Sequence, residues 1–250
     1  MTLGVVIPVY RGGESVGSVV EALARYARER ELRCRVVLVE DGSGGASREA
    51  VQTLANGRPG VTALLLPENV GQQRALWLGI RHLADCDVIA TMDQDGAHPV
   101  ALLDEMLRRI HEGAQVCYAV ARRRRYPLHR RLGALARDML FALCLGARDG
   151  ARVGAYRVMT RALARQLQPE PDGYIYLSAA ALALKPTVAC VRYEAGAGAQ
   201  PSTYTLPALL RMYGGLATHY TPLKAFRRRG ACAEPCAYET VAGRGWLWQP

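Results

Sequence analysis

Two aspartates separated by one residue, Asp93 and Asp95, follow directly after an apolar run. Side chains at positions i and i+2 of an extended chain lie on the same face, so both carboxylates can reach one cation. Hard oxygen ligands suit Mg²⁺ or Mn²⁺, and these ions also bind diphosphate oxygens. The pair therefore predicts a divalent-cation site that holds a nucleoside diphosphate and neutralises the charge it develops on leaving. The alternative is a solvated loop with two acids.

Three other segments that could bind a nucleotide also follow apolar runs. In Glu40-Asp41-Gly42-Ser43 a carboxylate could accept a hydrogen bond from a nucleobase imide or a ribose hydroxyl, unless the segment is an ordinary Asp-Gly turn. Pro8-Val9-Tyr10 could form a wall on which a base stacks, or simply a packed loop. Gly71-Gln72-Gln73-Arg74 opens a predicted helix, where N–H groups and the arginine could meet phosphate or ribose; the alternative is a simple helix start.

The elements that must position these motifs alternate along the first half of the chain. Apolar, β-branched runs about 25–30 residues apart predict four strands: Leu3–Val9, Arg35–Val39, Val61–Leu66 and Asp87–Met92. Amphipathic spacing between them predicts helices at Ser15–Ala27, Gln72–Leu83 and Val100–Ile110. The alternation predicts an α/β fold with a mostly parallel central sheet flanked by helices. Because ligands of such sheets bind at the carboxyl ends of the strands, all four motifs are expected on one rim.

The rest of the chain is less regular. We expect strands at Ala114–Val120 and Thr187–Tyr193, and a loop at Glu194–Ser202. Helices are expected at Pro127–Leu145, Arg161–Leu167, Tyr174–Leu184 and Thr205–Ala217. From Lys224 onward the sequence is basic and then Gly-rich, which predicts a partly disordered tail.

Charged residues are distributed unevenly between the two halves of the chain. The formal net charge is +10, but the first 115 residues carry more acids than bases, and the remainder carries twenty basic and seven acidic side chains. All but two of the basic residues are arginines, which pair well with phosphate and carboxylate groups. The second half is therefore expected to face an anionic partner: a phosphorylated ligand, a lipid headgroup layer or a nucleic acid.

Composition and missing motifs exclude several classes of protein. With 50% hydrophobic and 22% charged residues the chain is typical of globular proteins. The longest uncharged apolar stretch, Gly173–Leu184, is too short for a membrane span, and no signal peptide is recognised, so we expect a cytoplasmic protein. The seven cysteines are scattered, which favours free thiols over a disulfide framework or a zinc site. The absence of G-x-G-x-x-G after the first strand, of a P-loop and of G-x-S-x-G disfavours dinucleotide binding, P-loop phosphate binding and serine hydrolysis.

Taken in order, the motifs IPVY, VEDGS, ENVGQQRALWLGI and MDQDGAHP resemble glycosyltransferase family 2 with the GT-A fold. The similarity is greatest to the group of dolichol-phosphate mannose synthases and undecaprenyl-phosphate glycosyltransferases. It covers the first 115 residues well and continues more faintly through CYAVARRRR, GAYRVM and PSTYTLPALLRM. The resemblance implies an inverting, metal-dependent transfer of a sugar from a nucleoside-diphosphate sugar, with UDP favoured over GDP.

The resemblance also assigns roles to residues. Asp41 corresponds to the acid that binds the base, with Pro8, Tyr10 and Glu14 around the nucleotide. Asp93 corresponds to the acid contacting ribose or metal, and Asp95 to the principal metal ligand. The remaining residues predicted for the nucleotide-sugar are Glu40, Gly71, Gln72, Arg74 and Gln94. Those predicted for phosphate or acceptor are Arg122, Arg123, Arg137, Ser202 and Tyr204, and those predicted to be catalytic are Asp95, Arg157 and Asp172.

The acceptor is the open part of this interpretation. A polyprenyl phosphate at the cytoplasmic membrane face is favoured by the overall resemblance, with arginines contacting anionic lipid. A small soluble acceptor, such as a natural product, is favoured by departures from the family pattern: the lysine of its GESKY motif is Thr203 here. An acceptor phosphate needs little or no base, whereas a hydroxyl needs one, for which Glu170 and Asp172 are candidates unless they belong to a solvated Pro-rich turn.

A third hypothesis is a non-catalytic, basic nucleic-acid-binding protein, but no helix-turn-helix, zinc-finger or RNP motif is present, so no nucleic-acid partner is expected. By ligand, we divide the chain into three parts. Residues 1–115 form the nucleotide-sugar half of a GT-A domain, residues 116–223 the acceptor half, and residues 224–250 the basic, Gly-rich tail.

Overall fold

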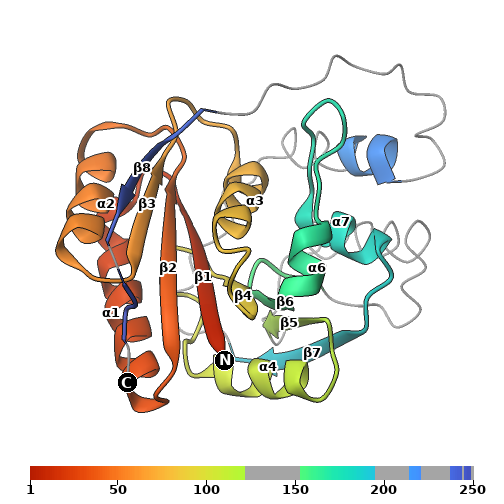
Figure 1. Cartoon of the computed structure of the whole chain (residues 1–250). Coiled ribbons are helices and arrows are strands. Elements are labelled where there is room, and N and C mark those ends of the chain that lie inside the picture. The colour runs from red at the N-terminus through yellow and green to blue at the C-terminus, as the bar shows by residue number, and fades with distance from the viewer. Residues whose placement is uncertain (122–152, 195–213, 221–236, 244, 249–250) are drawn as a thin grey trace.

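The computed structural model describes residues 1–121, 153–194, 214–220, 237–243 and 245–248, and its centre is one eight-stranded sheet (Figure 1). The strand order is β7-β5-β6-β4-β1-β2-β3-β8. Four parallel strands form its middle: β1 (Thr2–Val9), β2 (Arg33–Glu40), β3 (Val61–Leu65) and β4 (Val88–Thr91). The outer strands are β5 (Val116–Ala121), β6 (Arg157–Thr160), β7 (Val188–Tyr193) and β8 (Glu239–Ala242). Only β6 and β8 run antiparallel to their neighbours in this sheet, which confirms the mostly parallel α/β fold.

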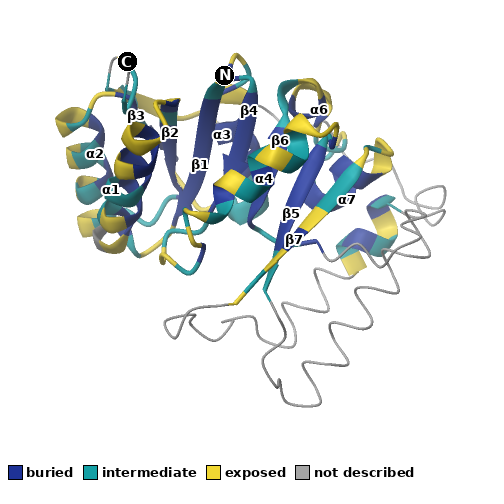
Figure 2. Ribbon diagram, turned by 90° about the horizontal axis from the view of Figure 1, so that it is seen from below, coloured by how far each residue is buried: buried dark blue, intermediate teal, exposed yellow. Residues whose placement is uncertain are grey.

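Helices cover both faces of the sheet, which is why its inner strands read as nearly continuous apolar runs. One face is covered by α1 (Gly13–Glu29), α2 (Gly45–Gly57) and α4 (Leu102–His111). The other is covered by α3 (Gln72–His82), α6 (Arg161–Gln166) and α7 (Leu177–Ala183). Alternate residues of β1 accordingly join different cores: Val5 and Ile7 pack with the first group, and Val6 with the second. Figure 2 shows the inner strands buried, the edge strand β7 partly exposed and the outer helix surfaces exposed.

The structure corrects the sequence predictions at two strands and one helix start. β6 and β8 were not predicted, and β8 lies in the tail that we expected to be partly disordered. It pairs with the edge strand β3, and beyond it the Leu247 N–H donates to Cys34 O at 2.7 Å. The helix predicted from Tyr174 begins at Leu177, because Glu170 N and Tyr174 O close a turn at 2.8 Å. The expected helix at 127–145 and the loop at 195–202 lie outside the described residues, while residues 214–220 are helical.

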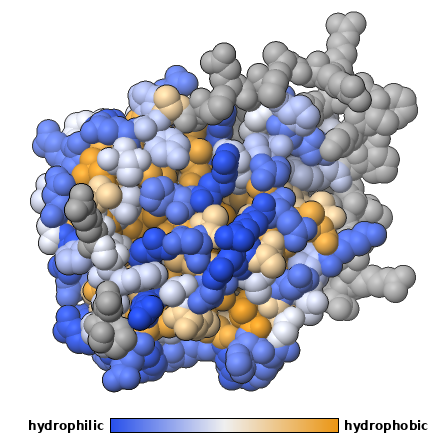
Figure 3. Space-filling view, in the orientation of Figure 1, coloured by the Kyte–Doolittle hydropathy of each residue, from blue (hydrophilic) through white to orange (hydrophobic). Residues whose placement is uncertain are grey.

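One sheet crosses the predicted boundary between the two halves, since β6 joins β4 to β5. The division at residue 115 therefore concerns ligand binding within a continuous sheet, and it stays a prediction. Across the described ranges, no helix combines the length and the apolar character needed to cross a bilayer. The face seen in Figure 3 is mostly hydrophilic, with smaller hydrophobic patches among the blue residues.

Candidate active site

The carboxyl ends of the four central strands lie at one rim of the sheet. The ends of β1, β2 and β3 are level because the register pairs Val9 with Glu40 and Glu40 with Leu65, while β4 ends at Thr91, opposite Val6. The predicted motifs follow these ends directly, so the rim collects the segments that begin at Tyr10, Asp41, Glu68 and Asp93. The topology thus brings together residues that lie far apart in the sequence.

Asp41 joins the loop after β2 to the start of α3. Its carboxylate is almost fully buried; Oδ1 accepts from Val70 N at 2.7 Å and Oδ2 from Gly71 N at 3.1 Å. Burial raises the pKa of this carboxyl, and the two amide hydrogen bonds oppose the rise. The following residue, Gly42, has φ 64°, and a Cβ there would lie 2.1 Å from Glu68 C. Asp41 and Gly42 therefore hold the loop after β2 against the segment that leads into α3.

Glu40 differs from Asp41 in having an acceptor atom without a partner. The residue is fully buried, and its Oε1 accepts from the N–H and the hydroxyl of Ser43, the N–H bond being 2.8 Å long. Its Oε2 is buried and has no hydrogen-bond partner in the described part of the chain. An unsatisfied buried acceptor is costly, and a donor on a ligand would satisfy it. Of the two adjacent acids, Glu40 is thus the one with an acceptor oxygen to spare.

The loop after β1 is held by Gln94. The side-chain amide of Gln94 accepts from Tyr10 N at 3.0 Å and donates to Tyr10 O at 3.1 Å. Gly12 makes room for it, since a Cβ there would lie 2.2 Å from Gln94 Nε2. The ring of Tyr10 is 41% exposed, with the Arg11 guanidinium 5.0 Å from its centroid. The amide of Gln94 joins two loops, and Tyr10 lies partly exposed at the rim with Arg11 over its ring.

Asp93 is supported from two sides. Its Oδ1 accepts from Gln72 Nε2 at 2.9 Å, and its backbone N–H donates to His98 Nδ1 at 3.0 Å. His98 Nε2 lies 3.5 Å from Asp93 Oδ2, and the buried imidazole stacks on Tyr156 with centroids 4.8 Å apart. Burial lowers the pKa of His98 and raises that of Asp93, the latter opposed by His98 and Arg157. The aspartate is therefore held in place by Gln72 at its carboxylate and by His98 at its backbone N–H.

Asp95 is exposed, and its Oδ1 accepts from Ala97 N at 2.9 Å. Together with Asp93 it offers hard carboxylate oxygens, which fit Mg²⁺ or Mn²⁺. Among the described residues, no group of three or more His, Cys, Asp or Glu side chains is arranged to hold a metal ion. A cation at these two carboxylates would therefore need oxygens from a ligand or from water to complete its coordination.

Arg157 is a buried cation whose described hydrogen-bond partners are all neutral. It is 1% exposed, and it donates to Thr91 Oγ1 at 3.2 Å and to Ser178 Oγ at 3.0 Å. Its Cζ lies 5.9 Å from the ring centroid of the buried Tyr118. No carboxylate forms an ion pair with Arg157 within the ranges that the structure describes, although its charge opposes the rise in the pKa of Asp93 that burial causes. A buried positive charge without a counter-ion favours a nearby anion.

Asp172 lies apart from the metal pair, in the turn before α7. Its Oδ1 accepts from Tyr174 N at 3.2 Å, and its Oδ2 lies 3.1 Å from His219 Nε2. Helix α7 begins three residues after Tyr174, and its first residue donates from Leu177 N to Gln73 Oε1 at 3.1 Å, at the start of α3. The segment that follows Asp172 is thereby attached to the same end of α3 that supports Asp93 and Asp41.

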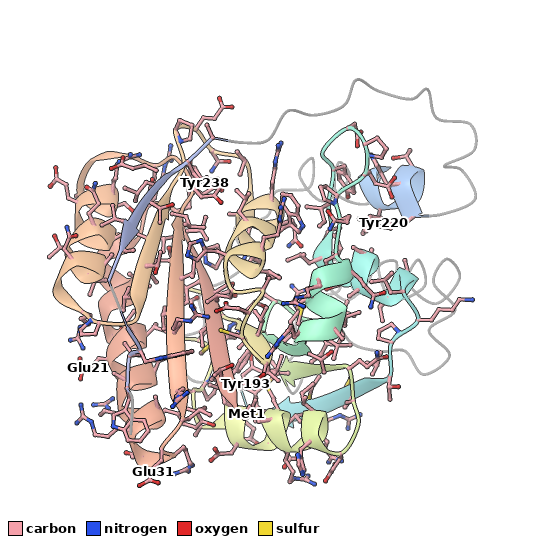
Figure 4. All side chains as sticks on the ribbon, viewed as in Figure 1. Met1, Glu21, Glu31, Tyr193, Tyr220 and Tyr238 are labelled. Atoms are coloured by element: carbon pink, nitrogen blue, oxygen red, sulfur yellow. The ribbon has the colours of Figure 1, made fainter. Side chains whose placement is uncertain are left out.

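The other predicted residues are placed as follows. Pro8 is buried in β1, Glu14 lies in the first turn of α1, and Gly71 and Arg74 lie at the start of α3. The predicted phosphate and acceptor residues Arg122, Arg123, Arg137, Ser202 and Tyr204 lie outside the described residues. Figure 4 shows the described side chains on the ribbon.

Sequence reasoning missed several side chains that support the site. His98 stands within the motif MDQDGAHP, so the motif itself could have indicated it. Ser178 and Tyr118 carry no such signal, because they reach Arg157 only through the packing of α7 and β5 against β6. His219 lies 47 residues from Asp172 in a part of the chain without a motif.

Comparison with known proteins shows the family to which the chain belongs. The family model described as Glycosyl transferase family 2 matches residues 4–170. The undecaprenyl-phosphate 4-deoxy-4-formamido-L-arabinose transferase of Proteus mirabilis (strain HI4320) is 31% identical over 66% of this chain and 49% of that protein. The transferase of the same name from Yersinia pestis (strain Pestoides F) is 27% identical over the same shares. The chain spans about half the length of these curated relatives.

Solved structures of glucosyl-3-phosphoglycerate synthase from Mycobacterium tuberculosis share the fold. The complex with Mn²⁺, UDP and glucosyl-3-phosphoglycerate matches with a TM-score of 0.63 at 19% identity, covering 88% of this chain and 80% of that one. The complex with Mn²⁺, UDP-glucose and phosphoglyceric acid matches with a TM-score of 0.65 at 17% identity, covering 97% and 89%. These matches confirm the GT-A fold, and the family match, which spans more than half of the chain, shows that it belongs to glycosyl transferase family 2.

Proposed function

We propose that this chain is an inverting, metal-dependent glycosyltransferase that moves a sugar from a UDP-sugar to a polyprenyl phosphate at the cytoplasmic membrane face. The observation that carries the proposal is the pair of carboxylates, Asp93 and Asp95, at the carboxyl end of β4, with Asp93 braced by Gln72 and His98. The named relatives, which are transferases of an undecaprenyl-phosphate sugar, support the acceptor.

The nucleotide would lie across the ends of β1 and β2. The buried, unpartnered Oε2 of Glu40 would accept from an N–H or O–H of the nucleoside, and the exposed ring of Tyr10 would stack on the base. Asp41 would act mainly by holding the start of α3, because both of its oxygens already accept backbone N–H groups. The UDP complexes of the structural neighbours support uridine as the nucleoside.

Asp93 and Asp95 would hold the divalent cation together with diphosphate oxygens, and their donor chemistry fits such an ion. When bound, the cation supplies neutralisation of the charge that the departing diphosphate develops. Arg157 would add fixed positive charge behind the pair, in a pocket where water does not screen it. A phosphate acceptor is already anionic at neutral pH, so attack on the anomeric carbon requires no general base.

A small phosphorylated acceptor is the second candidate. It is favoured by the structural neighbours, whose complexes hold phosphoglyceric acid and its glucosylated product. If the attacking group is a hydroxyl, a base is required, and Asp172 is then the proposed residue. In that case Asp172 would have to receive a proton with a lone pair that His219 and Tyr174 do not use.

A thermal-shift panel tests the donor site. We expect a UDP-sugar to raise the Tm of the full chain by mass action, and Mn²⁺ to enlarge the rise. Asp95→Asn should remove the enlargement. Asp85→Asn is the matched control, because Asp85 pairs with Arg35 just before β4, at the opposite end of the sheet. Failure of UDP-, GDP-, dTDP- and CDP-sugars alike to shift the Tm would contradict the proposal.

Product analysis separates the two acceptors. Two incubations with UDP-sugars are compared, one with undecaprenyl phosphate in detergent and one with 3-phosphoglycerate. The first should give a glycosylated lipid, and the second should give no glycosylated acid. Sedimentation with vesicles rich in anionic lipid should show binding at low salt that is lost at high salt. Transfer only to the soluble acid, without vesicle binding, would establish the second candidate instead.

A further inference from the structure

His219 lies between two hydrogen-bond acceptors. Its Nδ1 is 2.8 Å from Gly215 O, and its Nε2 is 3.1 Å from Asp172 Oδ2. A backbone carbonyl and a carboxylate can only accept, so both ring nitrogens must carry a proton for both contacts to be hydrogen bonds. The ring is 9% exposed, which leaves little room for water to substitute for either partner.

The hydroxyl of Thr218 offers an alternative that the geometry disfavours. Its Oγ1 lies 3.0 Å from His219 Nδ1 and could donate to a bare nitrogen. That hydroxyl already has Gly214 O as an acceptor at 2.9 Å. A bare Nδ1 would in addition oppose its lone pair to Gly215 O at 2.8 Å. A proton on Nδ1 removes this repulsion, so the doubly protonated ring accounts for all the contacts.

The imidazole joins helix 214–220 to the turn before α7. Its ring stacks on Tyr174 with centroids 3.9 Å apart, and Tyr174 N in turn donates to Asp172 Oδ1. Gly215 permits this approach, because a Cβ there would lie 2.6 Å from Tyr174 Oη. The residue after His219, Tyr220, accepts with its hydroxyl oxygen from Tyr176 N at 3.3 Å. Figure 1 shows this helix beside the turn, and Figure 4 labels its residue Tyr220.

We propose that His219 is a positioning residue which, carrying two ring protons, clamps helix 214–220 to Asp172 and so fixes the acceptor side of the site. Its position relative to the reaction rests on the proposed function, because the clamped turn leads directly into α7, whose first N–H is bonded to Gln73 of α3. The family match ends at residue 170, so the clamp belongs to the part of the chain beyond it.

Two acids and two tyrosines lie around the ring in the described part of the chain. Asp172 faces Nε2, and Glu170 lies in the same turn, so the described neighbours with charge are acids. The phenols of Tyr174 and Tyr220 are neutral near pH 7, since burial raises the pKa of both, that of Tyr220 to about 12.

Nitrogen NMR of the histidine rings tests the clamp without any substrate. The chain has 5 histidines, and loss of one set of signals in His219→Asn assigns the ring. At pH 6.5 we expect both nitrogens of His219 at the shifts of protonated imidazolium. Asp172→Asn should return one nitrogen to the unprotonated shift, whereas Thr218→Val, which leaves both acceptors in place, should not. An unprotonated nitrogen in the wild-type ring at this pH would overturn the proposal, as would loss of protonation in Thr218→Val alone.

Steady-state kinetics tests the positioning role. His219→Asn should lower kcat and raise the KM for the acceptor, together changing kcat/KM by about 10- to 100-fold, while the KM for the donor and the Tm shift with UDP-sugar stay unchanged. Thr218→Val should retain wild-type values. An unchanged acceptor KM and kcat in His219→Asn would refute positioning. If the wild-type chain transfers no sugar, the proposed function fails, and the NMR result still decides whether the clamp exists.

Discussion

The imidazole of His98 contacts Asp93 through both of its nitrogens: Nδ1 accepts from the backbone N–H at 3.0 Å, and Nε2 lies 3.5 Å from Oδ2. Because an amide N–H only donates, Nδ1 is bare and Nε2 carries the proton of a neutral ring. Burial, which lowers the pKa of His98, keeps it neutral. One side chain thus fixes both the backbone and the carboxylate of the first aspartate of the pair.

Replacing His98 by Phe should therefore weaken the metal site while keeping the fold. The Phe ring can still stack on Tyr156, but both contacts with Asp93 are lost. We expect Mn²⁺-dependent affinity for a UDP-sugar to fall about 10-fold, the lower end of losses when a supporting partner of a metal ligand is removed. Calorimetric titration in the presence and absence of Mn²⁺ measures this. Equal affinities of the variant and wild type with Mn²⁺ would mean that Asp93 needs no such support.

Glu40→Gln tests the buried acceptor at the end of β2. The amide oxygen can replace Oε1 as partner of Ser43, while the NH₂ group takes the place of the unpartnered Oε2. Stability should change little, because a buried charge is removed and the Ser43 bond is kept. Donor affinity should fall by about 1.5–3 kcal/mol, typical for the loss of a hydrogen bond to a charged acceptor. A variant that binds UDP-sugar as tightly as wild type would exclude Glu40 from nucleoside recognition.

The sequence predicts the rim well, because the features that build it are local. Apolar runs at regular spacing mark β1 to β4, and parallel strands necessarily gather the motifs after them at one edge. The pairing of Asp93 with Asp95, and the position of Glu40 and Asp41 nearby, follow from that rule alone.

The parts that were not predicted depend on contacts distant in sequence. β6 is only four residues long and begins with Arg157, whose burial no hydropathy pattern indicates. β8 pairs with β3, which would otherwise be an exposed edge strand, and the composition of the tail does not indicate this pairing. The Asp172–His219 contact joins a turn to a helix across 47 positions, so neither residue alone signals it.

Arg157→Met should separate function from stability. The guanidinium is 1% exposed and is bonded, within the described structure, only to neutral groups, so its burial is costly. Methionine fills a similar volume without charge, and the Tm should stay equal or rise. Transfer activity should fall by about 100-fold or more, because fixed charge behind the diphosphate is lost. A variant with lower Tm and normal turnover would show that Arg157 serves the fold instead.

Asp104 provides a pH dependence of stability away from the site. Its side-chain hydrogen bond from Arg30 lowers its pKa, with a further contribution from the Tyr26 hydroxyl at 2.8 Å. The stabilisation is therefore present above the ordinary carboxyl pKa near 3.8 and is lost as pH falls through the lower folded value. Asp104→Asn should lower the Tm at pH 7 by about 2 °C, since both partners are partly exposed. Tm scans should show this difference vanish towards pH 2; a constant difference would contradict the assignment.

The strand β8 shields the edge of the sheet, and removing it should expose β3 to other chains. In the intact chain β8 pairs with Thr62–Leu65 in antiparallel register, and Gly243 N donates to Val61 O at 2.8 Å. An uncovered edge strand offers unpaired N–H and C=O groups to a second copy. A chain ending at residue 236 should therefore have a lower Tm and a larger, concentration-dependent size in light scattering than the full chain. Trp246→Ala is the control, because it removes the ring that lies 4.7 Å from the Arg35 guanidinium but leaves β8 in place. If the shortened chain keeps the size of the full chain at every concentration, β8 contributes stability alone and does not protect the edge.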